Sequence, residues 1–158
     1  MSPKTTSASN GNRLLASLVK SDIELLRPDL ESRAFAVHHV FEEPNKPIRY
    51  VHFLDAGVAS VVTSIGNDKD IEIGIIGREG VTGGAVAMGN DRSPHKTYIQ
   101  IAGRGQRITA EKFRRAMRDS DSLRSIVMKS VSAFHVQTAP PPLQMREQPS
   151  NNAWPAGC

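Results

Sequence analysis

The chain has 158 residues, of which 39% are hydrophobic, and its formal net charge is +4. This length allows one domain with a hydrophobic core, and no apolar run approaches the roughly 18 residues that a membrane-spanning helix needs. The single cysteine, Cys158, can close no internal disulfide and excludes the cysteine set of an iron–sulfur sensor.

At the N-terminus, residues 1–11 are mostly small and polar and show no hydrophobic period. They lack the apolar segment of a secretory signal peptide. We therefore expect a disordered leader on a cytoplasmic protein.

Two short helices are expected next. Leu14 and Leu18 lie on one face of an amphipathic turn. Ser21 followed by Glu24 matches a capping box that would open a second helix, and Pro28 limits its length.

Beyond these helices the hydrophobic period changes to two, which is typical of β-strands. The expected strands cover residues 34–41, 48–54, 58–65, 70–76 and 96–101. Turn signals separate them, including a predicted turn at 55–57 and another at 66–68. Short strands with a turn between each pair indicate an antiparallel roll or sandwich, not βαβ units.

A helical region is expected to begin at Thr109 and to break at 119–121. The following helix, residues 122–138, carries an apolar stripe at helical spacing. The stripe consists of Leu123, Ile126, Val127, Val131 and Phe134. It would pack against the domain, pair with a second copy of the chain, or do both on different turns.

The helical pattern stops at Ala139, because three consecutive prolines follow and proline cannot continue a helix. Residues 139–158 carry five of the ten prolines and show no period, so we expect a disordered tail. These patterns assign the folded domain to residues 12–138.

The segment between the fourth and fifth strands is rich in glycine and ends in Arg92 and Ser93. Glycine lets the backbone come close to a ligand, and successive N–H groups in such a turn can hold an anion. An arginine beside a hydroxyl is well suited to a phosphate. The alternative is that the glycines only turn the chain and that Arg92 is a solvated charge.

The order of motifs along residues 12–138 resembles a known family. The motifs are 12–18 (NRLLASL), 22–28 (DIELLRP), 47–53 (PIRYVHF), 57–62 (GVASVV), 76–80 (IGREG) and 91–93 (DRS). Together they resemble the sensor domain of the Crp/Fnr family of bacterial transcription regulators. The resemblance implies a mainly β domain with flanking helices, a double-stranded β-helix or jelly roll of the cyclic-nucleotide-binding type (a β-roll), followed by a dimerisation helix.

In the family a helix-turn-helix DNA-binding module follows that helix, and the sequence shows none. The expected function is therefore regulatory ligand binding without catalysis, in a chain truncated before its DNA-binding module. We expect no specific DNA binding, no membrane association and a weak homodimer through the C-terminal helix. The basic run at 112–118 is interpreted as a solvated helix face.

By this resemblance the family's phosphate-binding segment falls on residues 81–93. The residues expected to contact the ligand are Gly83, Gly84, Ala85, Val86, Arg92 and Ser93. The family's glutamate, which accepts from the ribose 2′-hydroxyl, is missing, and Glu79 lies too early to replace it. Losing that hydrogen bond costs about 1–3 kcal/mol. Cyclic AMP and cyclic GMP are therefore in doubt, and another phosphate-bearing ligand, or none, remains open.

Two other functions stay open. The roll is shared with cupin-like metalloenzymes, and the chain has five histidines: His38, His39, His52, His95 and His135. Such sites need two histidines on one strand face, whereas adjacent His38 and His39 would point to opposite faces. We therefore expect no metal. The other alternative is a degenerate fragment that binds no ligand.

Overall fold

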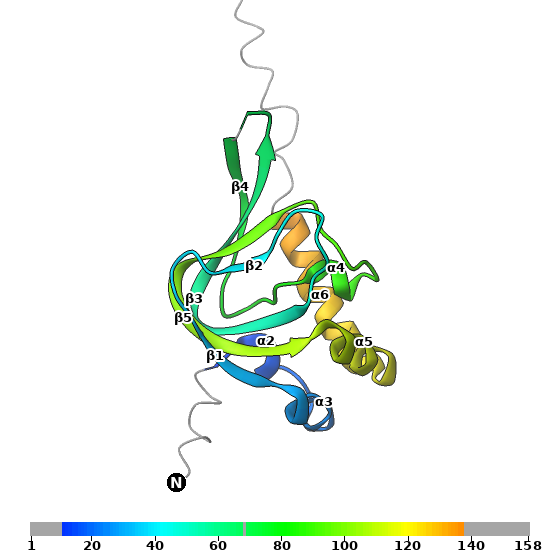
Figure 1. Cartoon of the computed structure of the whole chain (residues 1–158). Coiled ribbons are helices and arrows are strands. Elements are labelled where there is room, and N and C mark those ends of the chain that lie inside the picture. The colour runs from blue at the N-terminus through cyan, green and yellow to red at the C-terminus, as the bar shows by residue number, and fades with distance from the viewer. Residues whose placement is uncertain (1–10, 68, 138–158) are drawn as a thin grey trace, which may run out of the picture.

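The computed structural model describes residues 11–67 and 69–137, and only the backbone of residues 135–137 (Figure 1). The expected leader, apart from Gly11, and the expected tail lie outside the described residues. The described part of the chain starts with three short helices: α2 (Arg13–Ala16), α3 (Lys20–Leu26) and the 3₁₀ helix η1 (Arg27–Asp29). Asn12 caps α2 by accepting a hydrogen bond from the Leu15 N–H at 3.0 Å.

The described strands form one antiparallel sheet that curls into an open roll (Figure 1). They are β1 (Glu31–Phe35), β2 (Val40–Glu42), β3 (Tyr50–Ile65), β4 (Lys69–Ile76) and β5 (Lys96–Thr109). Their order is β1-β5-β3-β4, and β2 pairs with the other end of β5. Helices α4 (Gly84–Ala87), α5 (Ala110–Asp119) and α6 (Asp121–Gln137) complete the fold. The expected fold class, a mainly β roll with flanking helices, is confirmed.

The predicted turn at 55–57 is wrong. Strand β3 runs unbroken through it, and its pairing with β5 shifts register three times between Leu54 and Ala59. Gly57 has a φ of 96°, and a Cβ there would lie 2.7 Å from the carbonyl oxygen of Ile101. The glycine therefore marks a bulge that bends one long strand over the roll.

The predicted single strand at 34–41 is also wrong, because a turn divides it into β1 and β2. His38 adopts a left-handed φ of 77° in this turn, and the His39 N–H donates to the Ala36 carbonyl at 3.0 Å. The two strands consequently pair with different parts of β5.

The predicted capping box does not form. Helix α3 begins at Lys20, two residues earlier than a Ser21 cap predicts, and its cap residue Val19 makes no side-chain hydrogen bond. Ser21 therefore lies inside the first turn.

Two hydrophobic clusters hold the fold together. The larger lies between the sheet and the helices, where the rings of Phe53 and Phe113 meet edge to face with centroids 6.2 Å apart. The smaller fills the roll around Leu54 and Ile99. Thr109 caps α5 by accepting from the Lys112 N–H at 3.2 Å, which confirms the predicted start of the helical region.

The junction between α5 and α6 is held by a buried carboxylate on α3. The hydroxyls of Ser120 and Ser122 each donate to a different oxygen of Asp22, both at 2.5 Å. Ser120 also accepts from the Leu123 N–H at 3.1 Å, so it caps α6. The predicted break at 119–121 is confirmed, and these bonds fix where α6 begins its path across the roll.

Candidate functional site

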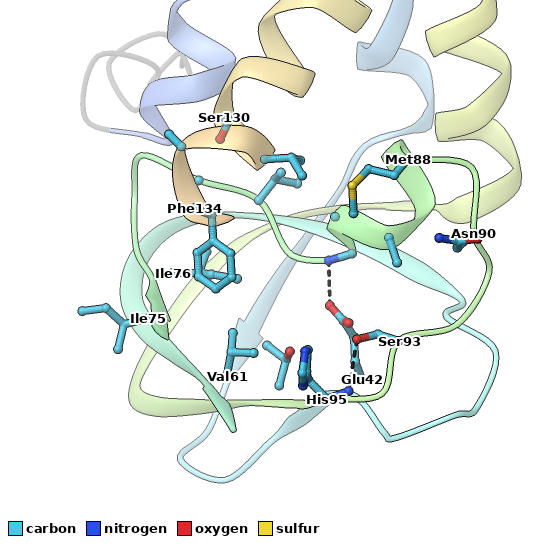
Figure 2. Close-up of a pocket in the computed structure, with 18 of the residues that line it drawn as sticks. Glu42, Val61, Ile75, Ile76, Met88, Asn90, Ser93, His95, Ser130 and Phe134 are labelled. Atoms are coloured by element: carbon cyan, nitrogen blue, oxygen red, sulfur yellow. Dashed lines mark hydrogen bonds between the residues drawn. The ribbon is translucent and has the colours of Figure 1, made fainter. Parts of the chain in front are cut away.

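A cavity of about 450 Å³ lies inside the roll, within the size range of small-molecule sites (Figure 2). Strands β2 to β5, the segment 79–85, the loop 90–95 and α6 all contribute to its wall. The lining residues used below are Glu42, Val61, Ile76, Glu79, Val81, Gly83, Gly84, Ala85, Arg92, Ser93, His95, Ser130, Val131 and Phe134. The cavity is therefore mainly apolar, with polar groups gathered near α4 and the loop 90–95.

Five of the six residues expected to contact a ligand line this cavity, but Val86 does not. Val86 is only 2% exposed and belongs to the larger hydrophobic cluster. Gly83 has a φ of 72°, and a Cβ there would lie 3.0 Å from Val51 Cγ2. Only glycine fits this conformation without strain, so Gly83 sets the direction in which α4 starts.

The glycine segment is fastened to β3 through Thr82. Its N–H donates to the His52 carbonyl at 3.0 Å, and its hydroxyl accepts from the His52 N–H at 3.0 Å. The His52 ring also lies 3.1 Å from Thr82 Oγ1, among Phe35 and Phe41. Burial lowers the pKa of His52 to about 3, so the ring is neutral at physiological pH.

Arg92 and Ser93 lie together on the loop 90–95, but both are held by neighbouring groups. Arg92 Nη1 donates to the Asn45 carbonyl at 2.8 Å, and Arg92 Nε lies 3.8 Å from the Asp91 carboxylate. Ser93 Oγ accepts from the His95 N–H at 3.1 Å. The Arg92 side chain is 54% exposed and already lines the cavity, and one of its guanidinium nitrogens is bonded to the Asn45 carbonyl.

Sequence reasoning missed Glu42, which is the buried acid of this site. Its Oε2 accepts a hydrogen bond from the Gly83 N–H at 2.6 Å, shown as a dashed line in Figure 2. Only 7% of Glu42 is exposed. Burial raises the pKa of its carboxyl above the ordinary value of 4.5, and the Gly83 hydrogen bond partly opposes that rise. A side-chain carboxyl of the protein thus occupies the N–H of Gly83, the first of the residues expected to contact a ligand.

Helix α6 closes the cavity opposite Glu42. Figure 2 shows Phe134 reaching from α6 toward Ile76 inside the roll. One turn earlier, Val131 packs against α4, because a Cβ built on Gly84 would lie 3.4 Å from Val131 Cγ1. Helix α6 therefore forms one wall of the cavity.

The residues that line the cavity carry more negative than positive formal charge. Glu42 and Glu79 contribute carboxylates, and Arg92 is the one Lys or Arg among the described lining residues. Although Glu79 falls outside the predicted phosphate-binding segment, it does line the cavity. When His95 is counted as neutral and both glutamates as ionised, the formal charge of the lining is −1.

Neither a metal site nor a membrane span emerges from the described residues. No group of three or more His, Cys, Asp or Glu in that part of the chain lies close enough to hold a metal ion. His38 stacks near Tyr98, whereas His39 contacts Phe41, and the His135 side chain lies outside the described residues. No described helix is both long and apolar enough to cross a bilayer.

No protein-family model and no curated protein matches the sequence. Solved structures do match. A cyclic nucleotide-binding domain from Methylobacillus flagellatus KT superposes with a TM-score of 0.63 at 10% identity, covering 92% of this chain and 80% of that one. The c-di-GMP responsive global regulator CLP of Xanthomonas campestris gives 0.65 at 13% identity, covering 76% of this chain and 61% of that one.

A third structure, the regulatory subunit of a cAMP-independent protein kinase A from Trypanosoma brucei, gives a TM-score of 0.62 at 11% identity. The match covers 78% of this chain and 43% of that one. This chain thus spans less than two thirds of CLP and of the kinase subunit, both regulatory proteins. It has the fold of cyclic nucleotide-binding domains.

Proposed function

We propose that residues 12–138 form the ligand-sensing domain of a Crp/Fnr-type transcription regulator, acting in the cytoplasm and without catalysis. The order of sequence motifs supports the family, and the shared fold supports the domain type. The observation that carries the proposal is that Val131 and Phe134 of α6 form part of the cavity wall. A ligand there would change the packing of the helix that leaves the roll.

In this proposal the ligand contacts Gly83, Gly84 and Ala85 on one side, and a phosphate-bearing ligand would reach Arg92 and Ser93. The chain by itself would not read a DNA sequence. Reading a groove needs an element presented to it, whereas α5 and α6 bury their apolar faces against the roll. Exposed basic residues on α5, such as Arg115 and Arg118, would give only weak, salt-sensitive association.

The test is thermal stabilisation by a panel of cyclic AMP, cyclic GMP, cyclic di-GMP, adenosine and guanosine, because a ligand that binds only the folded state raises the melting temperature. Ser130→Phe fills the cavity from α6, and Ser132→Phe is the matched control, since Ser132 is exposed and lies outside the lining. At least one compound should stabilise the parent chain and Ser132→Phe but not Ser130→Phe. Equal stabilisation of the two variants would mean that the compound binds outside the cavity and would contradict the assigned site, whereas no response to any compound would favour a degenerate fragment.

A further inference from the structure

We propose that Glu42 determines which ligands the cavity accepts: it admits uncharged molecules and excludes those that present a phosphate to α4. This inference deepens the proposed function and rests on it, because it assumes that the cavity binds a ligand. Glu42 would act as a specificity-determining residue that touches the ligand.

The first argument is geometric. Gly83 is the first of the residues expected to contact a ligand, and Glu42 Oε2 lies 2.6 Å from its N–H. A phosphate oxygen that used the same N–H would lie within hydrogen-bonding distance of a carboxylate oxygen. Two negative groups that close repel each other strongly where water is excluded.

The second argument is the absence of a compensating cation. In the described part of the chain, Glu42 forms no ion pair, and the one nearby guanidinium, that of Arg92, is bonded to the Asn45 carbonyl and faces Asp91. The Glu42 carboxyl group is buried without a neighbouring cation, so hydrogen-bond donors are the groups that stabilise it best. A neutral donor group on a ligand would supply one, whereas a phosphate would add a second negative charge.

The third argument concerns the rest of the wall. Val61, Ile76, Val81, Val131 and Phe134 give the cavity an apolar interior between β3, β4 and α6. The ligand class that fits is therefore an uncharged molecule with an apolar body and a hydrogen-bond donor that reaches Glu42.

Calorimetric titration of the full chain with cyclic AMP and adenosine tests this directly. The variant is Glu42→Gln, whose side-chain carbonyl can still accept from the Gly83 N–H. The control is Glu43→Gln, which removes the same charge from the next residue; Glu43 is exposed, pairs with Lys46 at 3.1 Å and lies outside the cavity lining. Cooperative melting curves for both variants establish that they fold.

Glu42→Gln should bind cyclic AMP about tenfold or more tightly than the parent chain and Glu43→Gln, with a much smaller change for adenosine. Adding Arg92→Ala to Glu42→Gln should remove most of the gain, which would locate the phosphate at Arg92 and Ser93. No gain in cyclic AMP affinity, or an equal gain for adenosine, would overturn the proposal. Failure of this experiment can be distinguished from failure of the thermal-stabilisation test of the proposed function. Failure there means that no panel compound stabilises the parent chain in a way that Ser130→Phe abolishes. Failure here means that removing the Glu42 charge gives cyclic AMP no gain in affinity beyond that of adenosine.

Discussion

Gly84 of α4 and Val131 of α6 face each other across a gap that would hold one methyl group, because a Cβ on Gly84 would lie 3.4 Å from one methyl group of Val131 and 3.5 Å from the other. This pair of residues connects the glycine segment that borders the cavity with the helix that crosses it. We therefore expect a ligand that displaces α4 toward Val131 to displace α6 as well.

The two adjacent glycines of this segment should respond differently to alanine. Gly83→Ala should lower the free energy of unfolding by about 1–2 kcal/mol or more, because φ is 72° and the new Cβ would meet Val51. Gly84→Ala adds a methyl at ordinary contact distance and should change it by less than about 1 kcal/mol. Urea unfolding measures both, and equal losses would contradict the assigned backbone conformation.

The carboxylate of Asp22 should be a major anchor of α6. Asp22→Ala removes the acceptor of two serine hydroxyls in a buried position, and we expect a loss of about 2–3 kcal/mol in the free energy of unfolding. Asp121→Ala is the matched control on α6, since its side chain is 90% exposed and only pairs with Arg124. That control should cost less than about 1 kcal/mol. Similar losses in both variants would rule out the anchoring role.

The free energy of unfolding should depend on pH through Glu42, and Glu42→Gln should remove this contribution. Because burial raises the pKa of Glu42 above 4.5, the folded state holds a proton that the unfolded state releases at that pH. Stability from this group therefore falls as pH rises from 4.5 through the folded-state pKa and is constant above it.

The measurement is urea unfolding of the parent chain and Glu42→Gln between pH 4.5 and about pH 8. The stability of Glu42→Gln relative to the parent should increase with pH over this interval. Other titrating groups, such as His52 and Asp55, are present in both chains and cancel in the difference. Parallel curves would mean that Glu42 has the same pKa in both states.

Any dimer formed through α6 should be weak. The apolar residues of α6, among them Leu123, Val127 and Val131, pack against the rest of the domain, and its exposed positions include Arg124 and Lys129. A helix of 17 residues spans only about 25 Å. Sedimentation should show a monomer–dimer equilibrium that depends on concentration, and a tight dimer at nanomolar protein would mean that another surface joins the copies.

The sequence predicted those features that depend on local chemistry. Thr109 was identified as the start of a helix because a hydroxyl cap acts within three residues, and the break at 119–121 likewise lies next to its cap, Ser120. The alternating pattern predicted β-structure in these regions, although it joined β1 to β2 and divided β3 at 55–57. The glycine-rich segment with Arg92 and Ser93 lies beside the cavity. These signals are all read within a few residues.

The features it missed depend on contacts between distant segments. Gly57 forms a bulge because of Gly103 and Ile101 on the neighbouring strand, which a turn signal cannot reveal. Glu42 becomes a site residue only because the fold brings it to Gly83, 41 positions away. Val86 faces the core because Gly83 sets the rotation of α4, and the pattern gave no means to predict that rotation.

Hydrogen exchange of α6 tests the central claim, that cavity occupancy is transmitted to this helix. The compound from the panel that most stabilises the parent chain should slow amide exchange in residues 126–134 by about threefold or more, and leave α5, which lies outside the lining, almost unchanged. Protection should be absent in Ser130→Phe and present in Ser132→Phe. Binding in the cavity with no change in α6 exchange, or exchange slowed equally in α5 and α6, would contradict the account.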